Sequence, residues 1–122
     1  MTASSRRHTR YVIPEGALLS QKIKGKGLLA GILGWAECRV RDLSIAGALI
    51  LTDKKMGIGD SICMRLTRAR GEELEFEGKV VNCGTDHRSG KYTLGISLSE
   101  QLPNSQEHVF LHKLAEVFPE AR

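Results

Sequence analysis

The sequence has few cysteines, few aromatic residues and no long hydrophobic run. Its 122 residues include three Cys, one Trp, two Tyr and three Phe. An odd number of widely spaced cysteines argues against a disulfide framework. No apolar run approaches the roughly 18 residues that a membrane-spanning helix requires. The polar first ten residues are not followed by an apolar segment, so they do not form a secretory signal. We therefore expect one cytoplasmic domain.

Catalytic and phosphate-binding motifs are missing as well. The glycine-rich segment 24–31 lacks the GK[ST] ending of a P-loop, and we interpret it as a flexible hairpin. No nucleophile, base and acid stand out as a set, so we expect no enzyme activity. His108 and His112 have the spacing of two metal ligands on a helix, but the glutamate of HExxH is missing and no third ligand is evident. We interpret them as a solvated helix face and predict no metal site.

Positive charge is concentrated in the first third of the chain. Residues 1–41 carry eight basic and two acidic side chains, whereas residues 42–122 carry ten basic and twelve acidic ones. This asymmetry favours an anionic partner near the first third, which could be a nucleotide, a nucleic acid or an acidic protein surface. Simple solubility is an equally good explanation of the charge alone.

Short alternating segments dominate the middle of the chain. Ala36, Cys38 and Val40 alternate with charged residues, which is the period-two pattern of a strand with one buried face. Together with a compact apolar run at residues 48–52, which is typical of a strand buried on both sides, such segments and the glycine-containing turns between them predict six strands. They lie at residues 16–23, 36–41, 48–52, 62–67, 73–81 and 92–98. Strands at this spacing predict a closed or nearly closed β-barrel over residues 11–99.

The pattern changes to a helical one near the C-terminus. Pro103 marks a break, and Asn104 followed by Glu107 has the spacing of a helix N-cap with its capping-box partner. One apolar helical face would then be formed by Phe110, Leu114, Val117 and Phe118. We expect a helix over residues 104–118 that covers one open end of the barrel.

Two short motifs carry group types that suit a guanine-bearing anion: RRHTR at residues 6–10 and DLSIAG at residues 42–47. Arginine forks suit phosphate oxygens and the N7/O6 edge of guanine. A carboxylate suits the opposite edge, where N1–H and the 2-amino group are donors. Serine adds a donor and an acceptor, and glycine allows close backbone approach. Taken separately, each motif is better explained as a solvated basic arm or an ordinary turn.

Taken together, these motifs, RRxxR followed by DxSxxG, resemble the PilZ domain, a small bacterial β-barrel whose members bind the second messenger cyclic di-GMP. The segment Gly95-Ile96-Ser97-Leu98 is similar to the late strand of the family, whereas Ala46 stands where many relatives carry a second glycine. The resemblance implies a mainly β fold over residues 1–122, a six-stranded antiparallel PilZ-type β-barrel with a C-terminal α-helix and a flexible arm at residues 1–10. It implies that the ligand-binding residues are Arg6, Arg7, Arg10, Asp42, Ser44 and Gly47.

The resemblance further implies a non-enzymatic receptor that binds cyclic di-GMP without any other cofactor. The arm would order around the ligand, and the domain would signal through a protein partner. Arg6 and Arg10 would contact phosphate and guanine N7/O6, Asp42 would accept from the guanine donors, and Ser44 would bond the same base or an adjacent phosphate. The main alternative is a PilZ-fold adaptor that binds a protein without nucleotide. A small-barrel nucleic-acid binder is a weaker alternative, since the few aromatic residues form no stacking platform.

Overall fold

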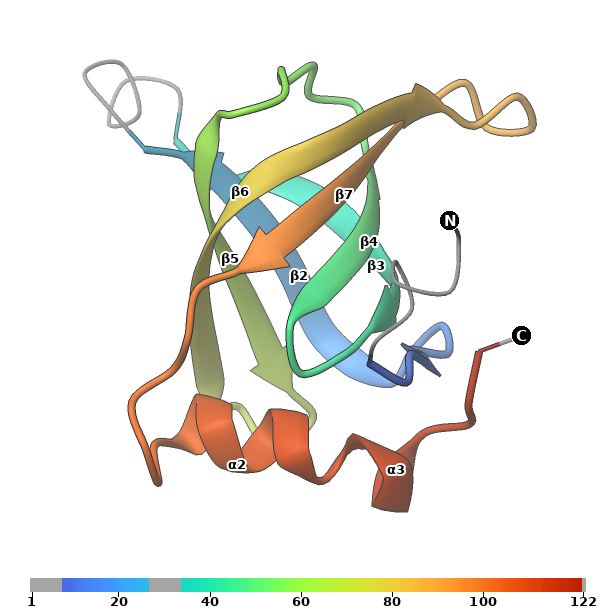
Figure 1. Cartoon of the computed structure of the whole chain (residues 1–122). Helices are drawn as coiled ribbons and strands as arrows, with labels where there is room; N and C mark the ends of the chain where they lie inside the picture. The colour runs from blue at the N-terminus through green and yellow to red at the C-terminus, as the bar shows by residue number, and fades with distance from the viewer. Residues whose placement is uncertain (1–7, 27–33, 122) are drawn as a thin grey trace.

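The computed structural model describes residues 8–26 and 34–121, and its main feature is an antiparallel β-sheet that closes into a barrel (Figure 1). The strand order is β1-β3-β2-β5-β6-β7-β4, and β4 also pairs with β3, which closes a barrel of six strands and leaves β1 as an addition to β3. The elements are β1 (Tyr11–Val12), β2 (Leu18–Gly25), β3 (Ala36–Leu43), β4 (Gly47–Thr52), β5 (Ser61–Arg68), β6 (Glu73–Thr85), β7 (Tyr92–Leu98), α2 (Gln106–His112) and α3 (Leu114–Val117). The predicted fold class is confirmed.

The barrel encloses one hydrophobic core because apolar residues alternate with polar ones along its strands. In β7, Leu94, Ile96 and Leu98 are buried, while the residues between them face outward. The same alternation in β5 and β6 directs Met64 and Phe76 into the same core. Full burial of a side chain of this size contributes about 1.5–3 kcal/mol. The core therefore holds the wall strands in register and leaves their outer faces available for binding.

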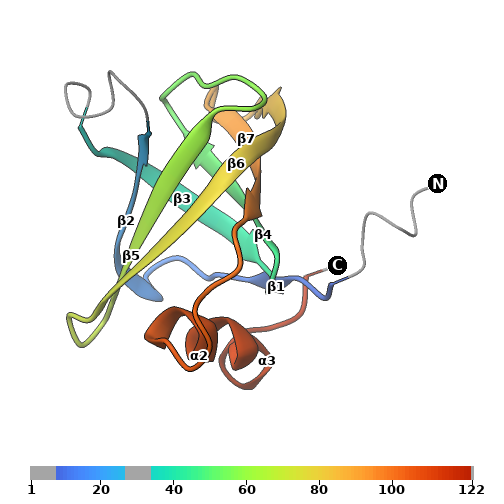
Figure 2. The same cartoon turned by 60° about the vertical axis from the view of Figure 1, so that its left-hand side comes forward.

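The two helices lie across one end of the barrel, as Figures 1 and 2 show. The segment predicted as one helix is divided at Lys113, which ends α2 and begins α3. Val117, which we expected on the buried face, is 65% exposed, and Leu111 is buried at 1% exposure instead. The break at Lys113 explains the error, because the helical periodicity that starts at Phe110 does not continue through it. Among the described residues, no helix combines the length and apolar character needed to cross a bilayer.

The start of α2 also differs from the prediction. Asn104 has φ 64°, in the left-handed region, whereas an N-cap residue has extended backbone. The N-cap is Ser105, whose Oγ accepts a hydrogen bond of 3.1 Å from the backbone N–H of His108. Glu107 forms no capping box with Asn104, since its carboxylate accepts from the backbone N–H of Glu75 in β6 at 3.0 Å. This contact fastens the helix to the barrel.

Two β-bulges change which residues face outward. The register shifts between Val40 and Asp42 where β3 pairs with β4, and between Val80 and Asn82 where β6 pairs with β7. Each bulge inserts an extra residue, so the second residue of each pair no longer shares the inward direction of the first. Val40 and Val80 are fully buried, whereas Asp42 and Asn82 both line a pocket on the outer wall.

The last described residues pair with the segment that precedes the barrel. The backbone N–H of Val12 donates to the carbonyl of Pro119 at 2.8 Å, and the N–H of Ala121 donates to the carbonyl of Arg10 at 2.7 Å. On its other side, β1 pairs with the end of β3 that carries Asp42. The base of the N-terminal arm is therefore held between β3 and the C-terminal segment, next to Asp42.

Candidate functional site

The turn that follows Asp42 is closed by Ser44. The backbone N–H of Ser44 donates to the carbonyl of Gly47 at 2.8 Å. Its Oγ accepts from the N–H groups of Ala46 and Gly47 at 3.1 and 3.0 Å. Ser44 is only 5% exposed. These local side-chain-to-backbone bonds fix the shape of the connection from β3 to β4.

Gly47 is required where β4 begins to pair with β7. A Cβ atom at this position would lie 2.9 Å from the carbonyl oxygen of Ile96. Because the obstacle is backbone, it cannot move aside as a flexible side chain can. The glycine therefore allows the turn to lie directly against β7.

We expect the substitution Gly47→Ala to lower the free energy of unfolding by about 1–3 kcal/mol, because its methyl group would press on the β7 backbone. Chemical denaturation of the two proteins measures this change. Gly57→Ala is a matched control, since a Cβ there meets only the Asp60 carboxylate at 3.8 Å. Its stability should remain close to that of the original protein. Equal stability of the Gly47→Ala protein would contradict the packing role.

Arg10 and Asp42 form a two-point ion pair. Nε of Arg10 donates to Oδ1 of Asp42 at 3.0 Å, and Nη2 donates to Oδ2 at 2.9 Å. Their side chains are 31% and 13% exposed, respectively. The hydrogen bond to Asp42 raises the pKa of Arg10 above its ordinary value, against the opposing effect of burial. The two hydrogen bonds occupy the edge of the guanidinium group that carries Nε and Nη2. The Nη1 group therefore points away from the carboxylate.

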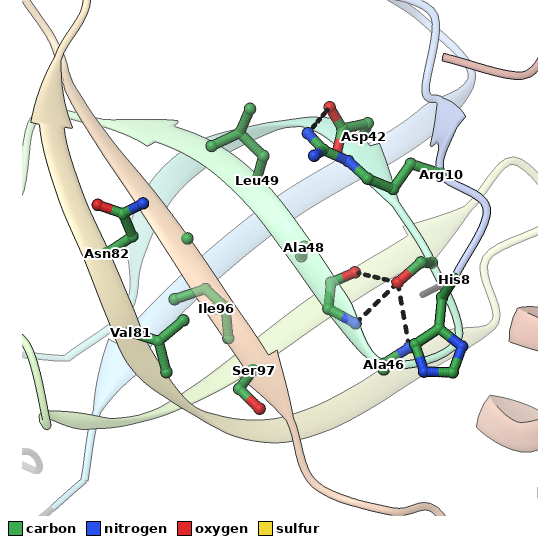
Figure 3. A pocket seen from close by; sticks show the side chains of 13 residues that line it. His8, Arg10, Asp42, Ala46, Ala48, Leu49, Val81, Asn82, Ile96 and Ser97 are labelled. Atoms are coloured by element: carbon green, nitrogen blue, oxygen red, sulfur yellow. Dashed lines mark hydrogen bonds and ion pairs between the residues drawn. The ribbon is translucent and has the colours of Figure 1, made fainter. Parts of the chain in front are cut away.

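The ion pair and the turn line an open pocket of about 550 Å³ on the outer wall of the barrel, which we call the wall pocket (Figure 3). Arg10 and Asp42 lie at one side in the figure, and Val81 and Asn82 of β6 lie across β4 and β7 from them. The lining residues outside the two motifs are Ala48, Leu49, Val81, Asn82, Gly95, Ile96 and Ser97.

Four of the six predicted site residues meet at the wall pocket. They are Arg10, Asp42, Ser44 and Gly47. Arg6 and Arg7 lie outside the described residues. The sequence reasoning missed the contribution of β6 and β7. A possible signal was Asn82, a polar residue directly after the apolar pair 80–81, at the point where the strand alternation stops.

The cysteines do not contribute a nucleophile to this pocket. Cys38, Cys63 and Cys83 are all free thiols, and none of them lines the wall pocket. Burial raises the pKa of Cys38 to about 12, which keeps its thiol protonated at neutral pH. The polar groups that do line the wall pocket include a guanidinium, a carboxylate and an amide, which form hydrogen bonds and charge contacts.

The sequence pattern of the PilZ domain matches residues 5–116. The chain belongs to the PilZ domain family. A solved structure titled "Structure of Bacillus subtilis Inhibitor of motility (MotI/DgrA)" is similar to this PilZ domain, with a TM-score of 0.66 and 16% sequence identity. The alignment covers 91% of this chain and 50% of that one, so the PilZ domain described here spans about half the length of its structural neighbour. No curated protein matches the sequence at a significant level.

Proposed function

We propose that this PilZ domain is a non-enzymatic, cytoplasmic receptor for cyclic di-GMP and that a protein partner reads its bound state. The convergence of Arg10, Asp42 and the turn at residues 43–47 on one pocket carries this proposal. A volume of about 550 Å³ suits a small-molecule ligand. Membership of the PilZ family supports cyclic di-GMP as that ligand.

Arg10 and Asp42 would recognise complementary parts of the ligand. Asp42 holds the Nε and Nη2 edge of Arg10, so the Nη1 end can donate to phosphate oxygens or to guanine O6 and N7. Each carboxylate oxygen of Asp42 has a second lone pair, which can accept from guanine N1–H and the 2-amino group. Arg6 and Arg7 precede Arg10 in the sequence and would add positive charge to the binding of the phosphates.

The remaining site residues would shape the pocket and complete the contacts. Ser44 would act mainly by closing the turn, because its hydroxyl already accepts from Ala46 and Gly47. The hydroxyl also donates to the carbonyl of Gly47 at 3.4 Å, and it can donate to a base or phosphate only if this long bond is exchanged. On the far side, Asn82 offers an amide, and Val81, which is 55% exposed, offers an apolar surface for a base. Binding would draw Arg6 and Arg7 to the ligand, and the partner would read that change.

Titration of the untagged chain with cyclic di-GMP by isothermal calorimetry tests this proposal. We expect saturable binding with a whole number of cyclic di-GMP molecules per chain, because the wall pocket is a single defined site. The Arg6→Ala/Arg10→Ala double variant should not bind, because it loses two of the proposed cationic contacts. Failure of the folded original chain to bind would reject the receptor function.

One observation favours a second function. Arg10 and Asp42 already bond to each other, so neither group requires a ligand to be satisfied. A PilZ-fold adaptor that binds a protein partner without nucleotide could keep this pair as a structural contact. The same calorimetric titration separates the two functions, since only the receptor binds cyclic di-GMP.

A further inference from the structure

A second hollow, of about 480 Å³, lies next to the wall pocket, and we call it the histidine pocket. Three of the four histidines of the chain line it: His8 from the arm, and His108 and His112 from α2. Glu100, which follows β7, contributes a carboxylate. His8 also lines the wall pocket, so the two hollows share this side chain.

The two helix histidines lie close together on α2. They lie four residues apart on α2, and their rings are stacked with centroids 4.1 Å apart and an interplanar angle of 29°. Nδ1 of His112 lies 2.9 Å from the backbone carbonyl oxygen of His108. Because a carbonyl can only accept, Nδ1 is the donor in this contact, and Nε2 is the nitrogen that remains for a ligand. A ring held in this way through one nitrogen is typical of a histidine that binds a metal through the other.

His8 supplies a third imidazole from a different part of the chain. It is exposed, two residues before Arg10, and lines the same hollow as the helix pair. In Figure 3 its ring lies beside Ala46, on the side of the turn away from Asn82. Across residues 8–26 and 34–121, no set of three ligand side chains is already assembled around one point. A movement of the arm is therefore needed to complete a site.

We propose, in contrast to the interpretation from the sequence alone, that His8, His108 and His112 bind one divalent late transition metal ion of the Zn²⁺ class, with Glu100 as a candidate oxygen ligand. Three imidazoles and an oxygen form a donor set that suits zinc, copper or nickel. The helix pair is the fixed half of the site, and His8 closes it. A bound ion would tie the arm to α2 beside the wall pocket. This inference does not depend on cyclic di-GMP binding.

Zn²⁺ titration of the untagged chain by isothermal calorimetry tests the site. We expect one ion per chain and a loss of affinity of about tenfold or more in each of His8→Ala, His108→Ala and His112→Ala, because loss of a mere hydrogen-bonding partner of a metal ligand already costs about tenfold or more. His87→Ala is the matched control, because this fourth histidine lies in the β6–β7 connection and lines neither pocket. Its affinity should equal that of the original chain. Circular dichroism checks that each variant keeps its fold.

Electron paramagnetic resonance of the Cu²⁺-loaded chain counts the coordinating nitrogens independently. Three imidazole nitrogens in the original chain and two in His8→Ala would support the site. An unchanged Zn²⁺ affinity in His108→Ala or His112→Ala would overturn the proposal. An unchanged affinity and spectrum in His8→Ala would overturn the role of the arm, because the site would then consist of helix residues alone.

Discussion

Replacing Arg10 by alanine is expected to weaken cyclic di-GMP binding by about a hundredfold or more, because charge-assisted bonds to phosphate or guanine contribute about 1.5–3 kcal/mol each. The free protein should lose only about 1 kcal/mol of stability, because the ion pair with Asp42 is partly open to solvent. Calorimetric titration measures the first effect, and chemical denaturation measures the second.

Arg70→Ala is the control for this prediction. It removes the same charge from the exposed turn between β5 and β6, away from the wall pocket, and should leave the affinity almost unchanged. A large loss of stability with little change in binding would instead make Arg10 a structural residue. Equal weakening by both substitutions would show that general positive charge, rather than the position of Arg10, governs binding.

The second large effect concerns the choice of base. The original chain should prefer cyclic di-GMP over cyclic di-AMP by about 10- to 100-fold, because a well-matched two-point base contact discriminates by roughly 1–3 kcal/mol. Adenine lacks the 2-amino donor and presents an acceptor at N1, so Asp42 would face a repulsive edge. In Asp42→Asn, the amide group places a donor near the guanine donors. Cyclic di-GMP binding should fall by about tenfold or more, and the preference should largely disappear.

Parallel titrations with the two nucleotides test this base recognition. Asp53→Asn is the control, because its exposed carboxylate pairs with Lys91 and does not line the wall pocket. If Asp42→Asn weakened both nucleotides by the same factor, Asp42 would act only by orienting Arg10. A preference that persisted in full would exclude Asp42 from base recognition.

Most strands could be predicted from the sequence. The barrel buries one face of each strand, and this produces an alternation of apolar and polar residues that is visible within a single short segment. The prediction placed the first strand too early, at residue 16, because Gly16 has φ 82° and belongs to the turn before Leu18. It also ended the fifth strand at residue 81, whereas β6 continues to Thr85. The bulge between Val80 and Asn82 interrupts the alternation there, so the pattern stops before the strand does. Strand β1 has two residues and depends on its neighbours, which no local pattern reveals.

The candidate site was predictable only as two separate motifs. Residues 8–10 and 42–47 are adjacent in the fold because β1 pairs with the end of β3, which is a long-range contact. The ion pair between Arg10 and Asp42 follows from that pairing and from the β3 bulge, so the sequence did not predict it. The residues of β6 and β7 that line the wall pocket were also missed because their position depends on long-range pairing. Strand order determines which outer faces lie beside the DxSxxG turn, and composition carries no information about strand order.

The pairing of residues 119–121 with the segment 10–12 has a consequence for solubility. A strand with an uncovered side presents unpaired N–H and carbonyl groups, and it can recruit a strand of another molecule. In this protein, the chain supplies its own cover: Pro119 and Ala121 bond to the side of the segment that faces away from β3. The segment that carries Arg10 is thereby shielded from edge-to-edge aggregation.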